Sequence, residues 1–188
     1  MKFTEFNFHP DIQKGIDSAG FSEATPVQEQ TFKHTLAAKD ILAQSQTGTG
    51  KTAAFLLSIF QLFMTDKIKR KKALILVPTR ELAVQIEEEA KLLGKFLPYK
   101  IGSFYGGVGY AKQEMLLQDG VDFCIATPGR LIDFLKSKKL SLSEFGAAIV
   151  DEADRMFDMG CIPDIRFMLK KMPPDGERIT MLFSATLS

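Results

Sequence analysis

The sequence has little of what several classes of protein require. Only two cysteines, Cys124 and Cys161, occur among its 188 residues, which is too few for a disulfide framework. No spacing of these cysteines and the two histidines resembles a metal site. The pattern is typical of a reduced protein that is not built around disulfides or a metal bound by cysteine and histidine.

Long hydrophobic runs and an excess of one charge are also missing. The first five residues contain no long apolar core, so we predict no signal peptide. The longest nearly apolar run, residues 53–64, is too short to span a bilayer and contains Ser58 and Gln61. Net charge is +1, so binding to nucleic acid would need a local patch. We expect a cytoplasmic protein with no membrane partner.

What the chain does have is the composition of a globular domain, with 45% hydrophobic and 25% charged residues. Its length suits one domain that buries roughly 70% of the surface exposed by the unfolded chain. The only charge run, residues 67–72, lies between a helix-like and a strand-like segment. A solvated loop is the simpler interpretation of this run, and an RNA-contacting patch is the sharper one.

Apolar runs rich in Ile, Val, Leu and Phe recur along the chain, with longer mixed segments between them. The clearest helix is expected over residues 80–97, and Pro10 and Pro26 could each open another. This alternation predicts an α/β domain in which helices cover both faces of a mostly parallel sheet. The predicted strands lie near residues 41–45, 73–77, 100–105, 122–126, 147–151 and 179–183.

Each predicted strand leads into glycine, threonine, proline or charged residues. The first strand is followed by the Gly-rich stretch 46–52, and the strand near 147–151 by three carboxylates. The carboxyl ends of parallel strands share one edge of the sheet, and open α/β sheets bind ligands at that edge. We therefore expect the polar segments to converge on one surface.

Residues 46–52 interrupt an apolar run between a predicted strand and a predicted helix. The N–H groups of a Gly-rich turn and of the following helix can cradle phosphates. Lys51 would reach the outer phosphates, and the Thr52 hydroxyl would ligate Mg²⁺. A strict phosphate-loop pattern has glycine where this chain has Ser45, and the alternative is an ordinary turn with an exposed lysine. The candidate cradle consists of Gln46, Thr47, Gly48, Thr49, Gly50, Lys51 and Thr52.

Asp151, Glu152 and Asp154 place three carboxylates at the end of an apolar strand. Clustered like charges need a cation, and Mg²⁺ binds through one or two carboxylates together with waters and phosphates. Asp151 is a candidate metal holder and Glu152 a candidate base for the attacking water. The alternative is an acidic helix start, and the upstream phosphate loop favours the metal and base roles.

Seven ordered motifs resemble the N-terminal RecA-like domain of a DEAD-box ATP-dependent RNA helicase. The resemblance covers residues 1–188, with a Q-motif region at 1–38 and a core at 39–188, and implies a RecA-like fold that uses ATP and Mg²⁺. The motifs are Gly20-Phe21 with Thr25-Pro26-Val27-Gln28, the stretch 46–52, Pro78-Thr79-Arg80-Glu81-Leu82, Gly106-Gly107, Thr127-Pro128-Gly129-Arg130, residues 151–154 and Ser184-Ala185-Thr186.

The resemblance also implies roles that spacing alone could not supply. Gln28 would read the adenine base, because a side-chain amide can both donate to it and accept from it. Phe21 and Phe3 would pack against the base, and Thr25 would belong to the same pocket. The alternative is that Gln28 is an ordinary helix residue and that both phenylalanines belong to the core.

Three further motifs resemble the family's RNA-contacting loops, and a fourth its coupling motif. Glycine N–H groups, threonine hydroxyls and arginines can bind backbone phosphates, so contacts independent of base sequence are expected. Ser184 and Thr186 would hydrogen-bond toward Asp154 and link the ATP state to the RNA state. The loop residues implicated are Pro78, Thr79, Arg80, Gly106, Gly107, Thr127, Gly129 and Arg130, although 127–130 also suits a simple helix-opening turn.

The chain departs from the family pattern at Ala24, Ser45 and Cys161, and most of all by stopping at Ser188. Complete family members carry a second RecA-like domain, which supplies arginine fingers worth ~10³–10⁵ in rate. We therefore expect a monomeric domain with little or no activity alone. Two other interpretations stay open, namely an ATP-gated RNA clamp and another nucleotide hydrolase without a nucleic-acid partner.

Overall fold

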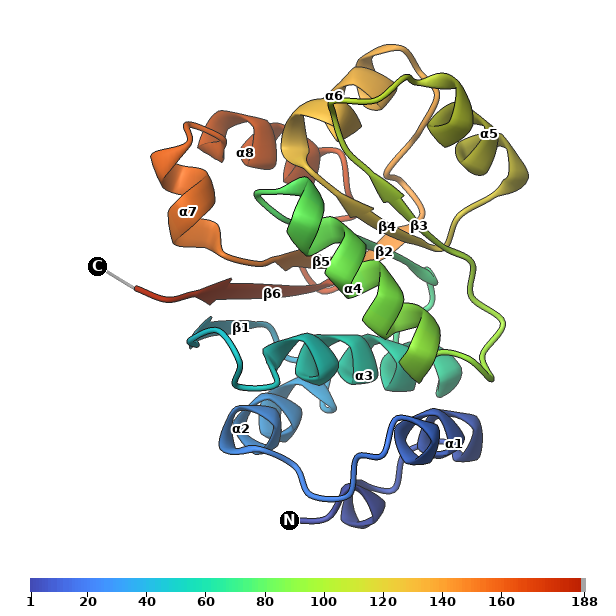
Figure 1. Ribbon diagram of the computed structural model, residues 1–188, viewed down its shortest axis with the longest axis vertical. Helices are drawn as coiled ribbons and strands as arrows, with labels where there is room; N and C mark the ends of the chain where they lie inside the picture. The colour runs from blue at the N-terminus through green and yellow to red at the C-terminus, as the bar shows by residue number, and fades with distance from the viewer. Residues whose placement is uncertain (187–188) are drawn as a thin grey trace.

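Six parallel strands form the central layer of the protein (Figure 1). The computed structural model describes residues 1–186. The sheet order is β1-β6-β5-β2-β4-β3, and every neighbouring pair is parallel. All six predicted strands are confirmed, with ends shifted by a residue or two. Their bounds are β1 (Ile41–Gln44), β2 (Lys72–Leu76), β3 (Ile101–Phe104), β4 (Phe123–Ala126), β5 (Phe145–Val150) and β6 (Ile179–Ser184).

Helices cover both faces of the sheet, as predicted. The core cluster on one face includes side chains from α1 to α4, and the cluster on the other includes side chains from α6 to α8. The bounds are η1 (Phe3–Phe6), α1 (Pro10–Ser18), α2 (Pro26–Thr35), α3 (Lys51–Met64), α4 (Arg80–Leu93), α5 (Ala111–Asp119), α6 (Pro128–Lys136), α7 (Ala153–Asp158) and α8 (Ile162–Lys170).

Proline and glycine mark the helix ends that matter most. Pro10 and Pro26 each open a helix, as predicted. Helix α4 ends at Leu93 and not at residue 97, because the C-cap Gly94 leaves the helical conformation (φ −92°, ψ 17°). Glycine is a weak helix former. The apolar repeat runs on past Gly94 to Leu97, and for that reason the predicted helix was too long. Leu97 still packs against the core from the loop.

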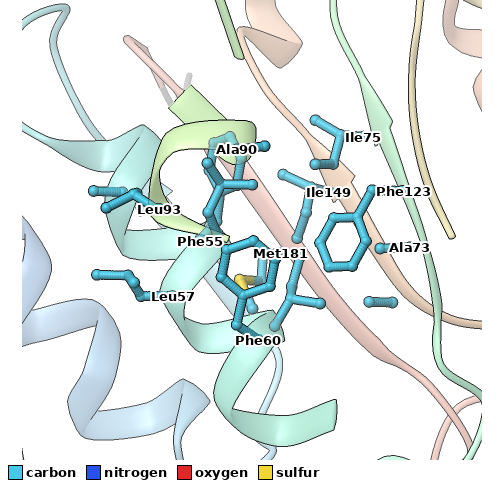
Figure 2. Close-up of a cluster of buried hydrophobic side chains, with 14 of the residues drawn as sticks. Phe55, Leu57, Phe60, Ala73, Ile75, Ala90, Leu93, Phe123, Ile149 and Met181 are labelled. Carbon is cyan, nitrogen blue, oxygen red and sulfur yellow. The ribbon is translucent and has the colours of Figure 1, made fainter. Parts of the chain in front are cut away.

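The larger core cluster packs α3 against the middle of the sheet (Figure 2). Phe60 and Phe63 of α3 meet Phe123 of β4 with ring centroids 5.1 and 5.8 Å apart, and Tyr99 lies 5.5 Å from Phe123. All six residues of β5 are buried. Aromatic pairs at these separations add to the free energy gained by burial, so α3 has a fixed position on the sheet.

The sheet directs its carboxyl ends toward one edge, as predicted. The register pairs Gln44 of β1 with Ser184 of β6, and Leu76 of β2 with both Val150 of β5 and Ala126 of β4. The polar segments that follow these strands therefore begin side by side. Among residues 1–186, none of the helices is long and apolar enough to cross a membrane.

The two cysteines should react at very different rates. Burial raises the pKa of Cys124, inside β4, to about 12. Burial and the Asp164 carboxylate also raise the pKa of Cys161, which is only partly buried. Because the thiolate is the reactive form, we expect a disulfide reagent to label one thiol of the native protein, slowly at pH 8 and faster as the pH rises. Labelling two thiols before unfolding, followed by absorbance, would contradict this assignment.

Candidate nucleotide-binding site

The loop between β1 and α3 needs glycine at two positions. Gly48 and Gly50 have φ angles of +82° and +85°, in the left-handed region that side chains rarely adopt. At Gly50 a Cβ atom would lie 2.5 Å from the Gln28 amide nitrogen. Gly50 is also the N-cap of α3, so the first N–H groups of that helix lack acceptors within the helix. These groups can bind an anion.

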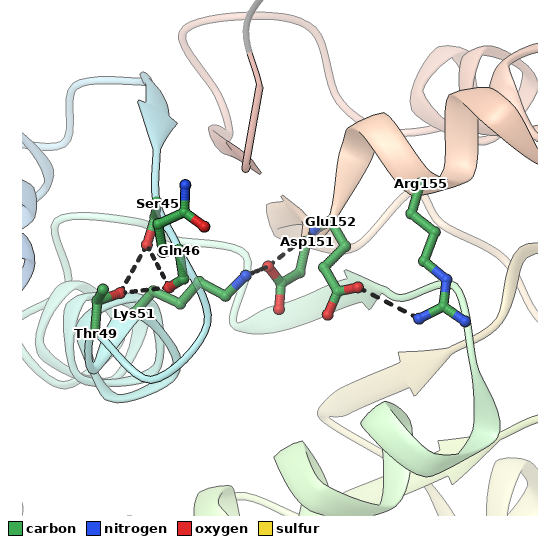
Figure 3. A network of polar contacts seen from close by, with 7 residues as sticks. All are labelled: Ser45, Gln46, Thr49, Lys51, Asp151, Glu152 and Arg155. Atoms are coloured by element: carbon green, nitrogen blue, oxygen red, sulfur yellow. Dashed lines mark hydrogen bonds and ion pairs between the residues drawn. The ribbon is translucent and has the colours of Figure 1, made fainter.

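Lys51 and Asp151 form the buried charge pair at the centre of the site (Figure 3). The Lys51 Nζ and the Asp151 Oδ1 lie 2.9 Å apart, and the exposed fractions of the two side chains are 9% and 0%. The Asp151 Oδ2 is buried and has no hydrogen-bond partner among residues 1–186. A buried carboxylate oxygen without a partner is costly, so this atom has the capacity to accept a bond from a further ligand or water.

The phosphate-type loop is also held by its own hydroxyls. The Ser45 and Thr49 hydroxyl oxygens lie 2.8 Å apart, and the Thr49 hydroxyl donates to the Gln46 carbonyl (Figure 3). Gln46 and Thr47 are exposed, and Thr52 is partly buried in the first turn of α3. Ser45 departs from the strict phosphate-loop pattern, and its contact with Thr49 was not predicted from the sequence.

Gln28 joins the start of α2 to the same loop. Its Oε1 accepts from the Thr25 N–H at 2.8 Å, and its Nε2 donates to the Gly50 carbonyl at 3.1 Å. The Thr25 hydroxyl donates to the Thr49 carbonyl at 2.8 Å. The Gln28 side chain is buried, with one amide hydrogen and one acceptor position still unused. Gln28 is therefore not an exposed residue of α2, and its contact with a base stays a prediction.

The two phenylalanines differ in exposure. Phe3 and Phe21 stack with their ring centroids 6.0 Å apart, and Phe3 also packs edge-on against Phe32. Phe3 is 1% exposed, whereas Phe21 keeps partial exposure. Only Phe21 has surface to offer to a base, and Phe3 supports it from the core side.

The residues that follow β5 lie beside the end of β6, and their coupling role stays a prediction. Glu152 adopts a left-handed backbone (φ 53°, ψ 50°) at the N-cap of α7, and its carboxylate lies 3.7 Å from Arg155. The Thr186 hydroxyl points to the Asp154 carboxylate at 3.5 Å, and the buried Ser184 hydroxyl donates to the Thr186 carbonyl.

The electrostatics of this corner favour an ionised Asp154. Burial alone would raise the pKa of Asp154, but hydrogen bonds from neighbouring groups, among them the Arg155 and Ala185 amides, lower it below its usual value. A carboxylate with a lowered pKa stays charged at neutral pH. Asp154 can therefore accept hydrogen bonds from β6 throughout the physiological range.

The loop after β2 leaves an arginine at the surface. Pro78 is buried, and the Thr79 hydroxyl caps α4 by accepting from the Leu82 N–H. The exposed Arg80 guanidinium lies over the Tyr105 ring, 4.8 Å from its centroid. An exposed guanidinium backed by an aromatic ring remains available to a phosphate.

Arg130 lies in a different environment from the one predicted. It is 7% exposed, and its guanidinium donates to the Val108 carbonyl at 2.8 Å and the Gln113 side chain at 3.1 Å. It also stacks on the Tyr110 ring at 4.0 Å. Direct contact of Arg130 with a phosphate does not follow from this geometry. The residue anchors the loop that carries Gly107, and sequence analysis missed Gln113 and Tyr110 as its partners.

The remaining residues of the loops predicted to contact RNA lie at or near the surface. Gly106 and Gly107 are exposed, and Gly107 has a φ of +84°. Thr127 is the N-cap of α6 and accepts no hydrogen bond through its side chain there. Gly129, in the first turn of α6, is exposed, with open space above it. Residues 127–130 form a helix-opening turn, and this geometry is also compatible with the predicted RNA-contacting loop.

Comparison with known proteins identifies the family. Residues 25–188 match the family model described as DEAD/DEAH box helicase. The chain belongs to the DEAD/DEAH box helicase family. All of the chain also matches proteins named ATP-dependent RNA helicase RhlB, with 48% identity in Hamiltonella defensa and 46% in Shigella dysenteriae. The chain spans 46% of the length of each of these relatives.

A solved structure supports the same DEAD/DEAH box assignment. It is described as a hypothetical ATP-dependent RNA helicase from Sulfolobus tokodaii, with a TM-score of 0.85 and 37% identity. The match covers 95% of this chain and 51% of that one. The predicted RecA-like α/β fold is thereby confirmed, and the chain corresponds to about half of such a helicase.

Proposed function

We propose that this chain is the ATP-binding half of an ATP-dependent RNA helicase. The observation that carries the proposal is the buried Lys51–Asp151 pair, which joins the Gly-rich loop to the end of β5 and leaves one Asp151 oxygen without a partner. An isolated structural ion pair would not need a glycine loop beside a helix N-terminus. A phosphate would bind Lys51 and the loop, and a hydrated cation would bind the Asp151 carboxylate.

The residues present fit ATP and Mg²⁺. Among residues 1–186 no three cysteine, histidine or acidic side chains are grouped closely enough to hold a metal alone. Mg²⁺ commonly uses one or two carboxylates, with waters and phosphates completing its shell. Asp151 and the Thr52 hydroxyl would hold it, and when bound it would offset charge on the phosphates. Lys51 would hold the outer phosphates.

Glu152 is the residue we propose as general base. It follows Asp151 directly, and its left-handed backbone is a strained conformation of the kind found at active sites. Its carboxylate would accept a proton from the attacking water, and Arg155 would orient it.

RNA and a second domain are the proposed partners. Arg80, Gly106, Gly107, Thr127 and Gly129 would contact the RNA backbone, and Arg130 would position the loop beside them. Relatives about twice the length of this chain are named ATP-dependent RNA helicases. In the complete protein, a second RecA-like domain would close over ATP and RNA, with Asp154, Ser184 and Thr186 linking the two sites.

Calorimetry with ATP and GTP tests the nucleotide proposal at Gln28. We expect ATP to bind about tenfold more tightly than GTP, because only adenine matches the free donor and acceptor of the Gln28 amide. Gln28→Ala should remove this preference. It should also weaken both nucleotides, since the Gly50 carbonyl loses its donor.

Gln30→Ala is the matched control, because Gln30 lies on the same helix and is exposed. It should leave both affinities unchanged. Equal binding of ATP and GTP by the unaltered chain would rule out base reading by Gln28. Absence of binding by either nucleotide would count against the nucleotide site itself.

A further inference from the structure

A groove lies near the amino ends of the strands, at the end of the sheet opposite the candidate nucleotide site. It has a volume of about 500 Å³ and is bounded by the end of α6, the segment 138–142 and the end of α8. These segments lead toward the amino ends of β5 and β6, whereas the candidate nucleotide site lies at the carboxyl ends. The groove therefore faces away from every loop assigned to ATP or RNA.

The groove is lined by cations over an apolar floor. Lys136, Lys138, Lys139 and Lys171 line it, and leucines and Phe167 contribute the apolar surface. No acidic residue lines it. Among residues 1–186, none of the four lysines lies within 4 Å of a carboxylate. Four like charges without counterions repel one another, so an anionic occupant would lower the energy of this surface.

The lysines stand at two helix ends beside the groove. Lys136 lies in the last turn of α6 and Lys171 is the C-cap of α8, where a cation is favoured by the helix dipole. Lys138 and Lys139 follow the end of α6 directly, where cations can also interact with the last carbonyls. Lys171 lies over the Phe167 ring, 5.3 Å from its centroid, and Phe167 is 37% exposed. An aromatic ring kept at the surface beside a lysine offers contact area to a partner.

Lys138 occupies a position that normally selects glycine. The N–H groups of Lys138 and Lys139 donate to the Leu135 and Phe134 carbonyls, which is the hydrogen-bond pattern of a Schellman helix end. Lys138 has a φ of +60° at the position where such ends usually carry glycine. The chain therefore carries a strained lysine at a position where glycine would be relaxed.

We propose that this groove binds an acidic peptide segment of a partner protein, with an apolar side chain on the leucine and Phe167 floor. Its carboxylates would pair with Lys138, Lys139 and Lys171 at the rim. Nucleic acid fits the groove less well, since backbone contacts use polar groups as well as cations and gain little from an apolar floor. Charge complementarity at the rim and an apolar centre are the usual anatomy of a protein interface.

Selection from a phage-displayed library of short random peptides tests the proposal, with the purified chain as bait. We expect the recovered peptides to combine Asp or Glu with Leu or Phe. A synthesised peptide should bind in fluorescence anisotropy. The double change Lys138→Glu with Lys139→Glu should weaken it about tenfold or more. Lys138→Gly should keep the fold, because glycine suits φ +60°, and should still weaken the peptide.

The control is Lys33→Glu with Lys39→Glu, which makes the same change in net charge at two exposed lysines elsewhere. The control should leave the peptide affinity unchanged. Recovery of no acidic peptide, or equal binding by all variants, would overturn the proposal. A uridine homopolymer RNA whose affinity falls only in the groove variants would also overturn it and would assign the groove to RNA.

Discussion

Replacing Lys51 with alanine should lower the affinity of this chain for ATP by about 100-fold or more. The ammonium group lies at the first turn of α3, directly after the Gly-rich loop, and no other lysine or arginine approaches Asp151 among residues 1–186. Removing it leaves the phosphates with backbone donors only. Calorimetric titration with ATP in Mg²⁺ measures the loss, and Lys39→Ala at an exposed position should bind normally.

The same change should also destabilise the fold. Asp151 is fully buried. Within the described residues 1–186 its Oδ2 already lacks a partner, and the variant would remove the only cation paired with its Oδ1. Breaking a buried ion pair on one side costs about 3–5 kcal/mol.

The double variant Lys51→Ala with Asp151→Asn separates the two effects. Thermal unfolding should show that it recovers much of the lost stability, because the asparagine side chain would carry no charge. The ATP affinity of the double variant should stay well below that of Asp151→Asn alone, which loses only the proposed Mg²⁺ holder. Equal ATP affinities of these two variants would show that Lys51 acts only through stability and does not hold phosphates.

Arg130→Ala should lower the free energy of unfolding by about 2–4 kcal/mol, since hydrogen bonds made by a charged donor contribute about 1.5–3 kcal/mol each. The guanidinium bridges Val108 and Gln113 and stacks on Tyr110. Arg130→Lys should recover little, because an ammonium cannot reproduce the planar fork. Denaturant unfolding measures both variants.

RNA binding by Arg130→Ala should also fall, because the loop that carries Gly106 and Gly107 loses its anchor. Comparison with Arg80→Ala separates positioning from contact. Loss of a direct phosphate contact lowers the slope of log affinity against log salt by about 1. We expect that change for Arg80→Ala and an unchanged slope for Arg130→Ala. A reduced salt slope for Arg130→Ala would show that Arg130 contacts an RNA phosphate directly.

The sheet was predictable because its signals are local. Each strand is a short apolar run that ends in glycine, proline or charge, and parallel pairing then brings those ends to one edge. Gly48, Gly50 and Lys51 were predictable for the same reason, since a glycine loop between strand and helix leaves few other uses for a lysine.

The roles of Arg130 and Phe3 were less accessible, because they depend on contacts between distant segments. Arg130 is buried by residues 17 to 22 positions earlier in the chain, and Phe3 by the packing of η1 beside Phe21 and Phe32. A motif gives the residue type and its place on an element. It does not show whether the side chain faces a ligand or the neighbouring loop.

The Gln28 amide binds the Thr25 N–H and the Gly50 carbonyl at once. A ligand that hydrogen-bonds to this amide would therefore change the free energy of the loop that faces the phosphates. Thermodynamic linkage makes the effect reciprocal, so a phosphate that moves Gly50 changes the affinity for the base by the same factor. The two ends of a bound nucleotide would then be recognised cooperatively and not as two independent sites.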